Sequence, residues 1–469
     1  MIDLARWWLT ATAIGVIAFP VAYRAFPALR DRGYGLSRAL GLLGAGYAFW
    51  ILTTVGAARN DLGGAWAGVL ALASASTWAG RGRWREIGTG IRENRRALVA
   101  MEALFLGAYL LWCLIRAANP EITATEKPME LMFLTSILRS PAFPPRDAWL
   151  SGYAISYYYF GYVLAAWLTR ITGVFSGVAF NLTNALWFAL TVLGAASLAY
   201  NLLPKPAPRR GLGAAWLAPI FVVLAGNLEG FLEVLHARHL FWQASPRGAM
   251  TSGVWKVLGI RELIEPPLAS PSWLPERYLW WWRASRVVHD VNLAGADVEV
   301  IDEFPFFSFL LADNHPHVLA LPFVLLGIGF ALNVYQHGRS REGRPGHQSE
   351  RGPAEFAALA LSSGAFWFGA WLLGALAFLN TWDFPIALAL LAAVLAWSLR
   401  SRGLLGVGSA AWTILSMAAA AFGLYLFWYL GFSSQAGGML PNLMFPTSIW
   451  QFGVMFAPAL APIAYWLIR

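Results

Sequence analysis

The chain is poor in cysteine and in charge, and each shortage excludes a class of protein. Cys113 is the single cysteine among 469 residues, which excludes an internal disulfide framework and any metal site built on paired cysteines. Charged residues make up 13% of the sequence, whereas soluble domains contain about 25%. Because 58% of the residues are hydrophobic and the mean hydropathy is +0.54, the composition indicates a protein that crosses a membrane several times.

Several catalytic signatures are also missing. The sequence contains no Walker phosphate loop, no GxSxG elbow and no HExxH motif, so NTP hydrolysis, serine hydrolysis and zinc proteolysis have no support. An inverted repeat with paired broken helices is not evident, which weighs against a secondary transporter. The net charge of +9 does not indicate nucleic-acid binding, because the arginines lie in short loops where orientation in the bilayer explains them.

The apolar runs predict about 11 membrane spans, since a helix needs about 20 mostly apolar residues to cross a bilayer. They are expected near residues 5–23, 39–58, 65–80, 98–117, 176–201, 214–235, 304–335, 356–378, 385–399, 404–430 and 450–468. Residues 152–170 are a further candidate. If this segment crossed the membrane, the basic loops at 205–210 and 339–351 would fall outside, against the rule that such loops stay in the cytoplasm. We therefore predict an all-α, polytopic transmembrane helix bundle with an external juxtamembrane helix at 152–170.

This topology separates two kinds of loop. The five basic loops lie inside, at 24–38, 81–96, 205–210, 339–351 and 400–402. The loops that carry other titratable groups lie outside, at 119–170, 236–303, 380–383 and 431–449. We therefore expect the functional site on the external face.

The first external loop carries titratable groups just after an apolar run, beginning with Glu121, Glu126 and Lys127. Further along lie three consecutive tyrosines, Tyr157, Tyr158 and Tyr159. A carboxylate such as Glu126 can act as a general base toward a hydroxyl at the membrane surface, and Lys127 can hold a phosphate as a point charge. A solvated loop with balanced charge is the alternative interpretation.

A second titratable group stands within the apolar run 304–335 and consists of Asp313, His315 and His317. Three such groups at membrane depth are expensive to bury in lipid and are typical of function. In a continuous helix Asp313 and His317 would share one face, whereas Pro316 would distort that turn. The set can bind a divalent metal, hold a phosphate, or form a structural hydrogen-bond cluster between helices.

Two further groups are candidates for binding. In the second long external loop, Arg283, Arg286 and His289 accompany Trp280–Trp282. This combination suits a lipid-linked anion or a sugar ring, and it equally suits an amphipathic surface helix anchored by tryptophan. Asp383 interrupts an apolar run within NTWDFP, where it is either a helix N-cap or part of the site.

Four strings carry a resemblance to a known family: EKPME, SYYYFGY, EFPFFSFLLADNHPHVLALPF and NTWDFP. From about residue 98 onward the chain resembles the YYY family, a group of uncharacterised membrane proteins named for the tyrosine triplet. The order of its segments is similar in turn to the C-type integral-membrane glycosyltransferases (GT-C). Those enzymes place an acidic residue early in the first large external loop, followed by surface helices and a second span. The resemblance implies a GT-C-like catalytic module at 98–469, preceded by a three-span extension at 1–97.

The resemblance also implies a function, the transfer of a sugar from a polyprenyl-phosphate-linked donor to an acceptor on the external face of the cell membrane. The candidate catalytic residues are then Glu126, Glu121 and Asp313. The candidate substrate-binding residues are Lys127, Tyr157, Tyr158, Tyr159, Arg283, Arg286, His289, His315, His317 and Asp383.

A divalent metal held by Asp313, His315 and His317 is the candidate cofactor. The expected partners are the sugar donor and membrane lipid, and not nucleic acid. Two alternatives stay open: a transporter or flippase for a lipid-linked or anionic solute, with the same three residues as a proton or ion relay, and a non-catalytic membrane subunit.

Overall fold

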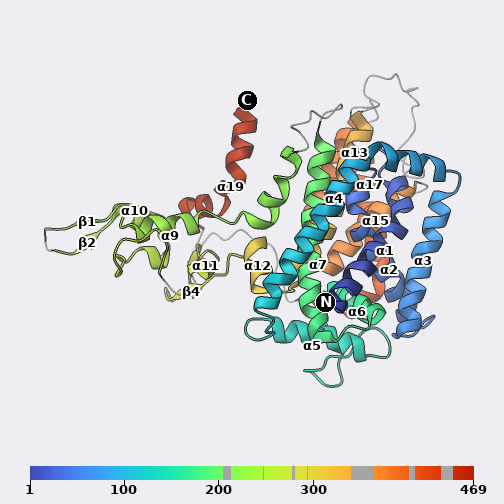
Figure 1. Ribbon diagram of the computed structural model, residues 1–469, viewed down its shortest axis with the longest axis horizontal. Helices are drawn as coiled ribbons and strands as arrows, with labels where there is room; N and C mark the ends of the chain where they lie inside the picture. Colours follow the sequence, from blue (N-terminus) through green and yellow to red (C-terminus); the bar gives the residue numbers. More distant parts are fainter. Residues whose placement is uncertain are drawn as a thin grey trace. The chain divides into compact units, whose positions relative to one another are not determined.

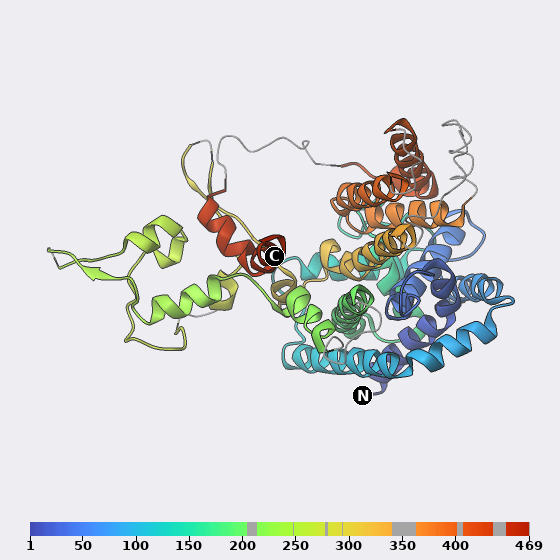
Figure 2. The same cartoon turned by 90° about the horizontal axis from the view of Figure 1, so that it is seen from above.

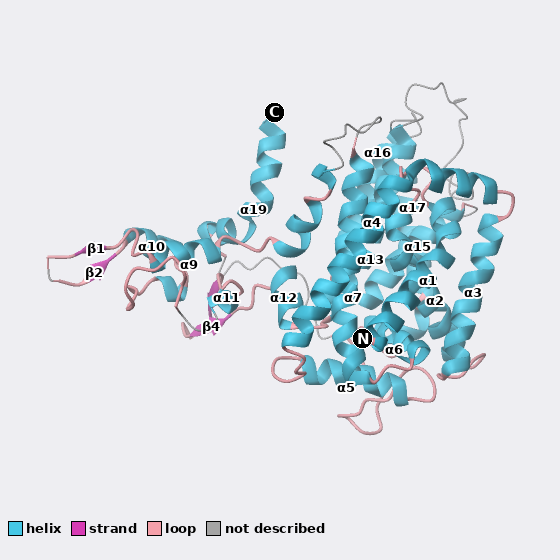
Figure 3. Ribbon diagram, in the orientation of Figure 1, coloured by secondary structure: helices cyan, strands magenta, loops and turns pink. Residues whose placement is uncertain are grey.

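The computed structural model describes residues 1–203, 213–246, 248–276, 280–292, 294–339, 363–400, 407–434 and 447–468. Within these residues the chain is mostly helical, as Figure 3 shows, and it divides into two units. Unit 1 comprises Met1–Pro219 and Ala312–Ser434, and unit 2 comprises Ile220–Leu311 and Gln435–Arg469. Helices from both the predicted extension at 1–97 and the predicted module at 98–469 lie in unit 1.

Unit 1 is a bundle built mainly of long helices (Figure 1). Its helical elements are α1 (Ile2–Ala25), η1 (Tyr34–Leu36), α2 (Ser37–Thr54), α3 (Leu62–Gly80), α4 (Trp84–Ala118), α5 (Lys127–Arg139), α6 (Phe160–Thr172), α7 (Ser176–Leu202), α13 (Pro316–Arg339), α15 (Gly364–Leu379), α16 (Asp383–Arg400), α17 (Val407–Leu424) and α18 (Leu426–Tyr429).

Six of the described helices are long and apolar enough to cross a membrane. They are Ile2–Ala25, Tyr34–Thr54, Trp84–Ala118, Ser176–Leu202, Pro316–Arg339 and Ile449–Ile468. A pair bent by 75°, Gly213–Leu224 with Glu229–Ala237, makes a seventh if it is counted as one span. Shorter apolar helices lie at Gly364–Leu379, Asp383–Ser398 and Ala411–Leu424. The predicted class, a helical protein with several membrane spans, is confirmed, and the total of about 11 stays a prediction.

Helix α7 forms the centre of unit 1. In its most apolar stretch 94% of the residues are buried, and Figure 2 shows it surrounded by other helices. Trp187 on α7 is fully buried and donates a hydrogen bond to the Leu319 carbonyl of α13 at 2.8 Å. On the other side, Trp112 of α4 stacks on Phe188 with ring centroids 3.8 Å apart. Aromatic packing therefore fixes α4 and α13 against α7.

The helix predicted at 152–170 is not among the candidate spans, but the structure corrects its predicted position on the membrane surface. The helix in that region, α6, begins at Phe160, and every residue from Phe160 to Thr169 is buried. A helix lying on a membrane surface exposes a polar face, and α6 exposes none along these residues. The cause is a close fit with two neighbours: a side chain at Gly46 of α2 would collide with Leu164, and one at Gly161 would collide with Leu319.

The structure also corrects the single span predicted at 304–335, which is two helices. The chain forms α12 (Pro305–Leu311) and α13, and residues 312–315 between them are not helical. Ala312 has a φ of +63°, a left-handed conformation that ends a helix and is strained for a residue with a Cβ. Pro316 then opens α13, since proline fits the first helical position and disfavours helix at the residue before it. Asp313 and His317 therefore do not share a helix face.

Unit 2 combines short helices with two small hairpins. Its elements are η2 (Ile220–Leu224, a π-helix), α9 (Glu229–Ala237), β1 (Gln243–Ala244), β2 (Met250–Thr251), α10 (Gly253–Leu258), η3 (Arg261–Leu263), α11 (Trp280–Arg283), β3 (His289–Val291), β4 (Asp297–Glu299), α12 and α19 (Ile449–Ile468). Strands β1 and β2 pair antiparallel, as do β3 and β4. Its core cluster consists of Trp255, Ile260, Leu263, Val287 and Val454.

Candidate functional site

The site begins at the amino end of α5, a helix that is not among the candidate spans (Figure 1). Ala124 and Thr125 have φ values of +61° and +52°, so the backbone turns sharply before the helix. Glu126 follows at the N-cap position, and Pro128 fits the first turn. A carboxylate at this place is stabilised by the positive end of the helix dipole. The Glu126 side chain makes no capping bond and is 54% exposed.

Glu126 pairs with His315, which precedes α13. Glu126 Oε2 lies 2.9 Å from His315 Nε2, and the Tyr157 hydroxyl lies 3.2 Å from the same nitrogen. His315 Nδ1 lies 2.9 Å from His317 Nδ1. With Glu126 ionised, Nε2 of His315 carries the hydrogen, so its Nδ1 accepts from His317. The structure thus links a carboxylate to two imidazoles through consecutive hydrogen bonds.

Asp383 extends this group from the start of α16. It accepts a hydrogen bond from the Asn380 side-chain amide at 3.1 Å and interacts electrostatically with His317. Of the two predicted roles for Asp383, the N-cap role is wrong, because Asp383 is itself the first residue of α16. The other predicted role, that Asp383 is part of the site, stays a prediction, and its interaction with His317 agrees with it.

Deeper in the site, Glu130 and Asp313 form a pair of buried carboxyl groups. The Glu130 side chain is fully buried, and its Oε2 accepts a hydrogen bond from the backbone N–H of Asn314 at 2.9 Å. Burial raises the pKa of Glu130 well above its ordinary value, and the neighbouring Asp313 carboxyl raises it further through a hydrogen bond and its charge. The Asn314 amide acts in the opposite direction. A raised pKa means that the Glu130 carboxyl keeps its proton to a higher pH than a solvated glutamate does.

Asn314 holds the break before α13 against the rest of the bundle. Its backbone N–H donates a hydrogen bond to Glu130, and its side-chain amide donates one to the Phe180 carbonyl of α7 at 3.0 Å. Both bonds are buried, where an unmade hydrogen bond costs about 1–3 kcal/mol. This residue therefore positions Asp313 and His315 on either side of it.

Two buried cations complete the site. Arg116, in the last turn of α4, is 3% exposed, and its Nε donates to Asn181 Oδ1 at 3.0 Å. Its Nη2 has no hydrogen-bond partner among the described residues. Lys127 is 7% exposed. Burial lowers the pKa of Lys127, Arg116 lowers it further, and Asp313, Glu130 and Glu121 act against this change. Two neighbouring buried cations are typical of an anion site.

The tyrosine triplet divides into two parts. Tyr157 stacks on Tyr158 with centroids 4.1 Å apart, and both are half-buried beside the cluster. Burial, and then Tyr158, raises the pKa of Tyr157, so its hydroxyl stays protonated. Tyr159 is 3% exposed and packs edge-on against Phe378. Tyr159 is thus a core residue, and its predicted contact with substrate is not supported by its position.

The predicted residues of the second long loop form a cluster of their own in unit 2. Arg286 pairs with Glu299 at 2.9 Å, and its guanidinium lies 4.2 Å from the Trp282 ring centre. Arg283 pairs with Glu262. His289 lies 3.0 Å from Asp297. The predicted binding residues Arg283, Arg286 and His289 line one pocket of about 450 Å³, so the loop builds a defined concave surface.

The described part of the chain contains no group of three or more His, Cys, Asp or Glu side chains arranged to hold a metal ion. The divalent metal at Asp313, His315 and His317, one of three interpretations of that set, gains no support from this arrangement. The backbone break separates Asp313, which pairs with Glu130, from the two histidines, which bond to each other.

Sequence reasoning missed three residues of the cluster. Glu130 stands one helical turn after Glu126 within EKPME, so the helix period offered a signal. Arg116 closes the apolar run before the loop, where a lone cation usually marks a span end. Asn314 carried no signal, because its role depends on Glu130 and Phe180, which are distant in sequence. Glu121 is exposed and accepts only a 3.5 Å hydrogen bond from Thr123 among the described contacts.

Comparison with known proteins places this cluster in a family. Residues 45–469 match the model of a family described as uncharacterized membrane protein, DUF2298. The chain belongs to this family. The matched residues include the whole titratable cluster around Glu126, His315 and Glu130, and also the pocket in unit 2. No curated protein and no solved structure matches the chain.

Proposed function

We propose that this DUF2298 protein is a membrane glycosyltransferase that takes its sugar from a polyprenyl-phosphate-linked donor at the external face. The observation that carries the proposal is the arrangement of a half-exposed carboxylate, Glu126, 2.9 Å from His315, with the buried cations Arg116 and Lys127 nearby. A base for the acceptor and a cationic site for the leaving phosphate are the two groups that this reaction requires.

Glu126 is the proposed base. Its carboxylate reaches solvent, so an acceptor hydroxyl can approach it, while His315 lies within hydrogen-bond distance and the helix dipole favours a negative charge at this position. In the reaction the acceptor hydroxyl gives its proton to Glu126, and its oxygen forms a bond to the anomeric carbon of the sugar. The bond from that carbon to the phosphate oxygen breaks, and its electron pair leaves with the polyprenyl phosphate.

Arg116 and Lys127 are the proposed partners of the leaving phosphate. The unused Nη2 donor of Arg116 is a buried group that a phosphate oxygen would satisfy. Burial lowers the pKa of Lys127, and the Arg116 charge lowers it further. An anion placed between these two cations would stabilise both charges. The raised pKa of Glu130 favours its uncharged form, which places less negative charge beside this phosphate.

A proton-coupled flippase is the second candidate function. The observation that favours it is the pair of 2.9 Å contacts that connect Glu126 to His315 and His315 to His317. Such a series of titratable groups can pass a proton. The two functions differ in the fate of the donor, because an enzyme cleaves the sugar from the phosphate and a flippase moves the intact lipid.

Purified protein in lipid nanodiscs, incubated with a panel of radiolabelled polyprenyl-phosphate sugars and hydroxyl acceptors, tests the proposal. We expect release of polyprenyl phosphate together with label on an acceptor for at least one sugar. A nanodisc has no second compartment, so flipping cannot produce this signal. Binding of donor without cleavage, combined with movement of intact donor in sealed vesicles, would favour the flippase. Failure of the protein to bind any lipid-phosphate sugar would overturn both.

A further inference from the structure

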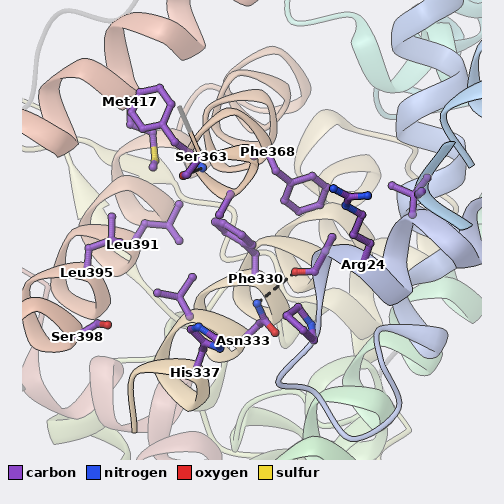
Figure 4. Close-up of a pocket in the computed structure, with 18 of the residues that line it drawn as sticks. Arg24, Phe330, Asn333, His337, Ser363, Phe368, Leu391, Leu395, Ser398 and Met417 are labelled. Carbon is purple, nitrogen blue, oxygen red and sulfur yellow. Dashed lines mark hydrogen bonds between the residues drawn. The ribbon is translucent and has the colours of Figure 1, made fainter. Parts of the chain in front are cut away.

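A large pocket lies in unit 1 away from the cluster just described. It has a volume of about 670 Å³ and opens among six helices, α1, α3, α13, α15, α16 and α17. Most of its lining is apolar, and Figure 4 shows Leu391, Leu395 and Met417 on one side with Phe330 and Phe368 on the other. The volume falls in the range of small-molecule sites, about 300–1,000 Å³.

The length of α13 separates this pocket from the titratable cluster. His315 precedes the helix, whereas Phe330, Asn333 and His337 of the pocket lie on its later turns. A helix of 24 residues is about 36 Å long at about 1.5 Å per residue, close to the thickness of a bilayer. The pocket therefore lies toward the membrane face opposite the cluster.

Basic loops gather at the same end. Trp78 and Ala79 of the pocket precede the α3–α4 turn, which carries Arg81 and Arg83 and lies at the upper end of unit 1 in Figure 1. The loop after α1 joins it there, since Arg32 Nη2 of that loop lies 3.8 Å from Glu86 Oε1. Arginine-rich loops are typical of the cytoplasmic side, where the membrane surface carries anionic lipid.

The pocket has two basic residues in an otherwise apolar lining. Arg24 is exposed and its guanidinium lies 4.3 Å from the Trp78 ring centre, while His337 is half-buried. An arginine over a tryptophan at the end of a span is placed at headgroup depth. In a membrane, an apolar pocket of this size among spanning helices favours hydrocarbon over water.

We propose that this pocket binds a lipid with a phosphate headgroup, whose chain lies between Leu391, Leu395 and Phe330 and whose phosphate meets Arg24 and His337. The lipid contacts α1 and α3 on one side and α13, α15, α16 and α17 on the other. It thus joins the amino-terminal helices of unit 1 to its carboxy-terminal helices. This site is independent of the proposed sugar transfer.

Native mass spectrometry of the protein in uncharged detergent tests the proposal, with three probes. Phosphatidylglycerol has both chain and phosphate, diacylglycerol lacks the phosphate, and inorganic phosphate lacks the chain. We expect one tightly bound phosphatidylglycerol, diacylglycerol weaker by about five-fold or more, and no competition from inorganic phosphate. The factor of about five corresponds to roughly 1 kcal/mol per basic residue near an anionic headgroup. Equal binding of the two lipids would overturn the phosphate contact.

Two pairs of variants locate the site. Leu395→Trp fills the pocket, and Leu415→Trp on α17, which is 64% exposed and outside the lining, is its matched control. Arg24→Gln removes the cation, with Arg6→Gln at the other end of α1 as control. We expect Leu395→Trp to abolish the tight binding and Arg24→Gln to weaken it about five-fold. Normal binding by Leu395→Trp and by a second filling variant, Ala75→Trp, would place the lipid elsewhere and overturn the proposal.

Discussion

Around the first turn of α13 the neighbouring side chains are titratable, and around its last turns they are almost all apolar. At the first turn the backbone is irregular, with Ala312 in a left-handed conformation, and Asn314 bonds to two other elements. At the far end the helix is regular, and Phe330 and Leu391 face an open pocket. The difference teaches that one helix can serve two sites, because hydrogen bonds fix the titratable residues at its first turn, whereas mostly apolar side chains enclose the pocket at its last turns.

The strongest test of this comparison is whether the two ends face opposite sides of the membrane. We expect Trp149→Cys, in the loop after α5, to react with an impermeant thiol reagent in intact cells, and Arg83→Cys, in the α3–α4 turn, not to react at all. Both positions are exposed, and the buried Cys113 of the wild type gives the blank. Reaction of Arg83→Cys after permeabilisation is the control. The reverse pattern in intact cells would invert the topology.

The largest expected effect on activity is that of Glu126→Gln. Glutamine keeps the size and the contact with His315 but cannot take a proton, and general-base catalysis contributes about 10²–10⁴-fold. We expect sugar transfer to fall by about that factor, with donor binding largely kept. The matched control is Glu121→Gln, an exposed carboxylate in the same loop. Loss of transfer with Glu121→Gln, and not with Glu126→Gln, would exchange the two roles.

Lys127→Ala is expected to lower the affinity for the sugar donor more than it lowers the rate of sugar transfer. Removal of a buried charge that contacts a phosphate costs about 2 kcal/mol, so donor affinity should fall about 10- to 100-fold. Equilibrium binding of a radiolabelled donor measures it. Arg139→Gln, at the exposed end of the same helix, should bind the donor normally. An unchanged affinity in Lys127→Ala would exclude Lys127 from the phosphate site.

The smallest effect concerns the pH dependence of stability at the polar end. The folded protein keeps the Glu130 proton to a higher pH than the unfolded chain does. Its folded state therefore binds more protons between the two pKa values, and stability falls as the pH rises through that window. Glu130→Gln removes this fall, so its melting temperature should exceed that of the wild type increasingly from pH 5 to pH 8. A difference of 1 kcal/mol corresponds to about 2–4 °C.

Melting curves at several pH values measure this effect, with Glu121→Gln as the control because that carboxylate is exposed. Lys127, whose pKa is lowered, changes stability in the opposite direction, because stability rises with pH between its lowered pKa in the folded protein and its ordinary pKa. A Glu130→Gln protein whose melting temperature follows the wild type at every pH would show that Glu130 ionises freely.

Much of the candidate site could be anticipated as a set of residues, but not as a set of contacts. The spacing of Glu126 and Lys127 after an apolar run indicated a site, and His315 was named from its cost in lipid. The pairing of Glu126 with His315 joins residues about 190 positions apart, and no local pattern encodes it.

The sequence by itself determined that the protein is helical and crosses the membrane several times. The reason is that the free energy of burying a run of apolar residues is local and adds along the chain. Only the tertiary structure decided that α6 is buried, that Tyr159 lies in the core while Tyr157 faces His315, and that Glu130 is buried beside Asp313. These outcomes depend on which helices pack together, since side chains distant in the sequence set each other's solvation, hydrogen bonds and charge.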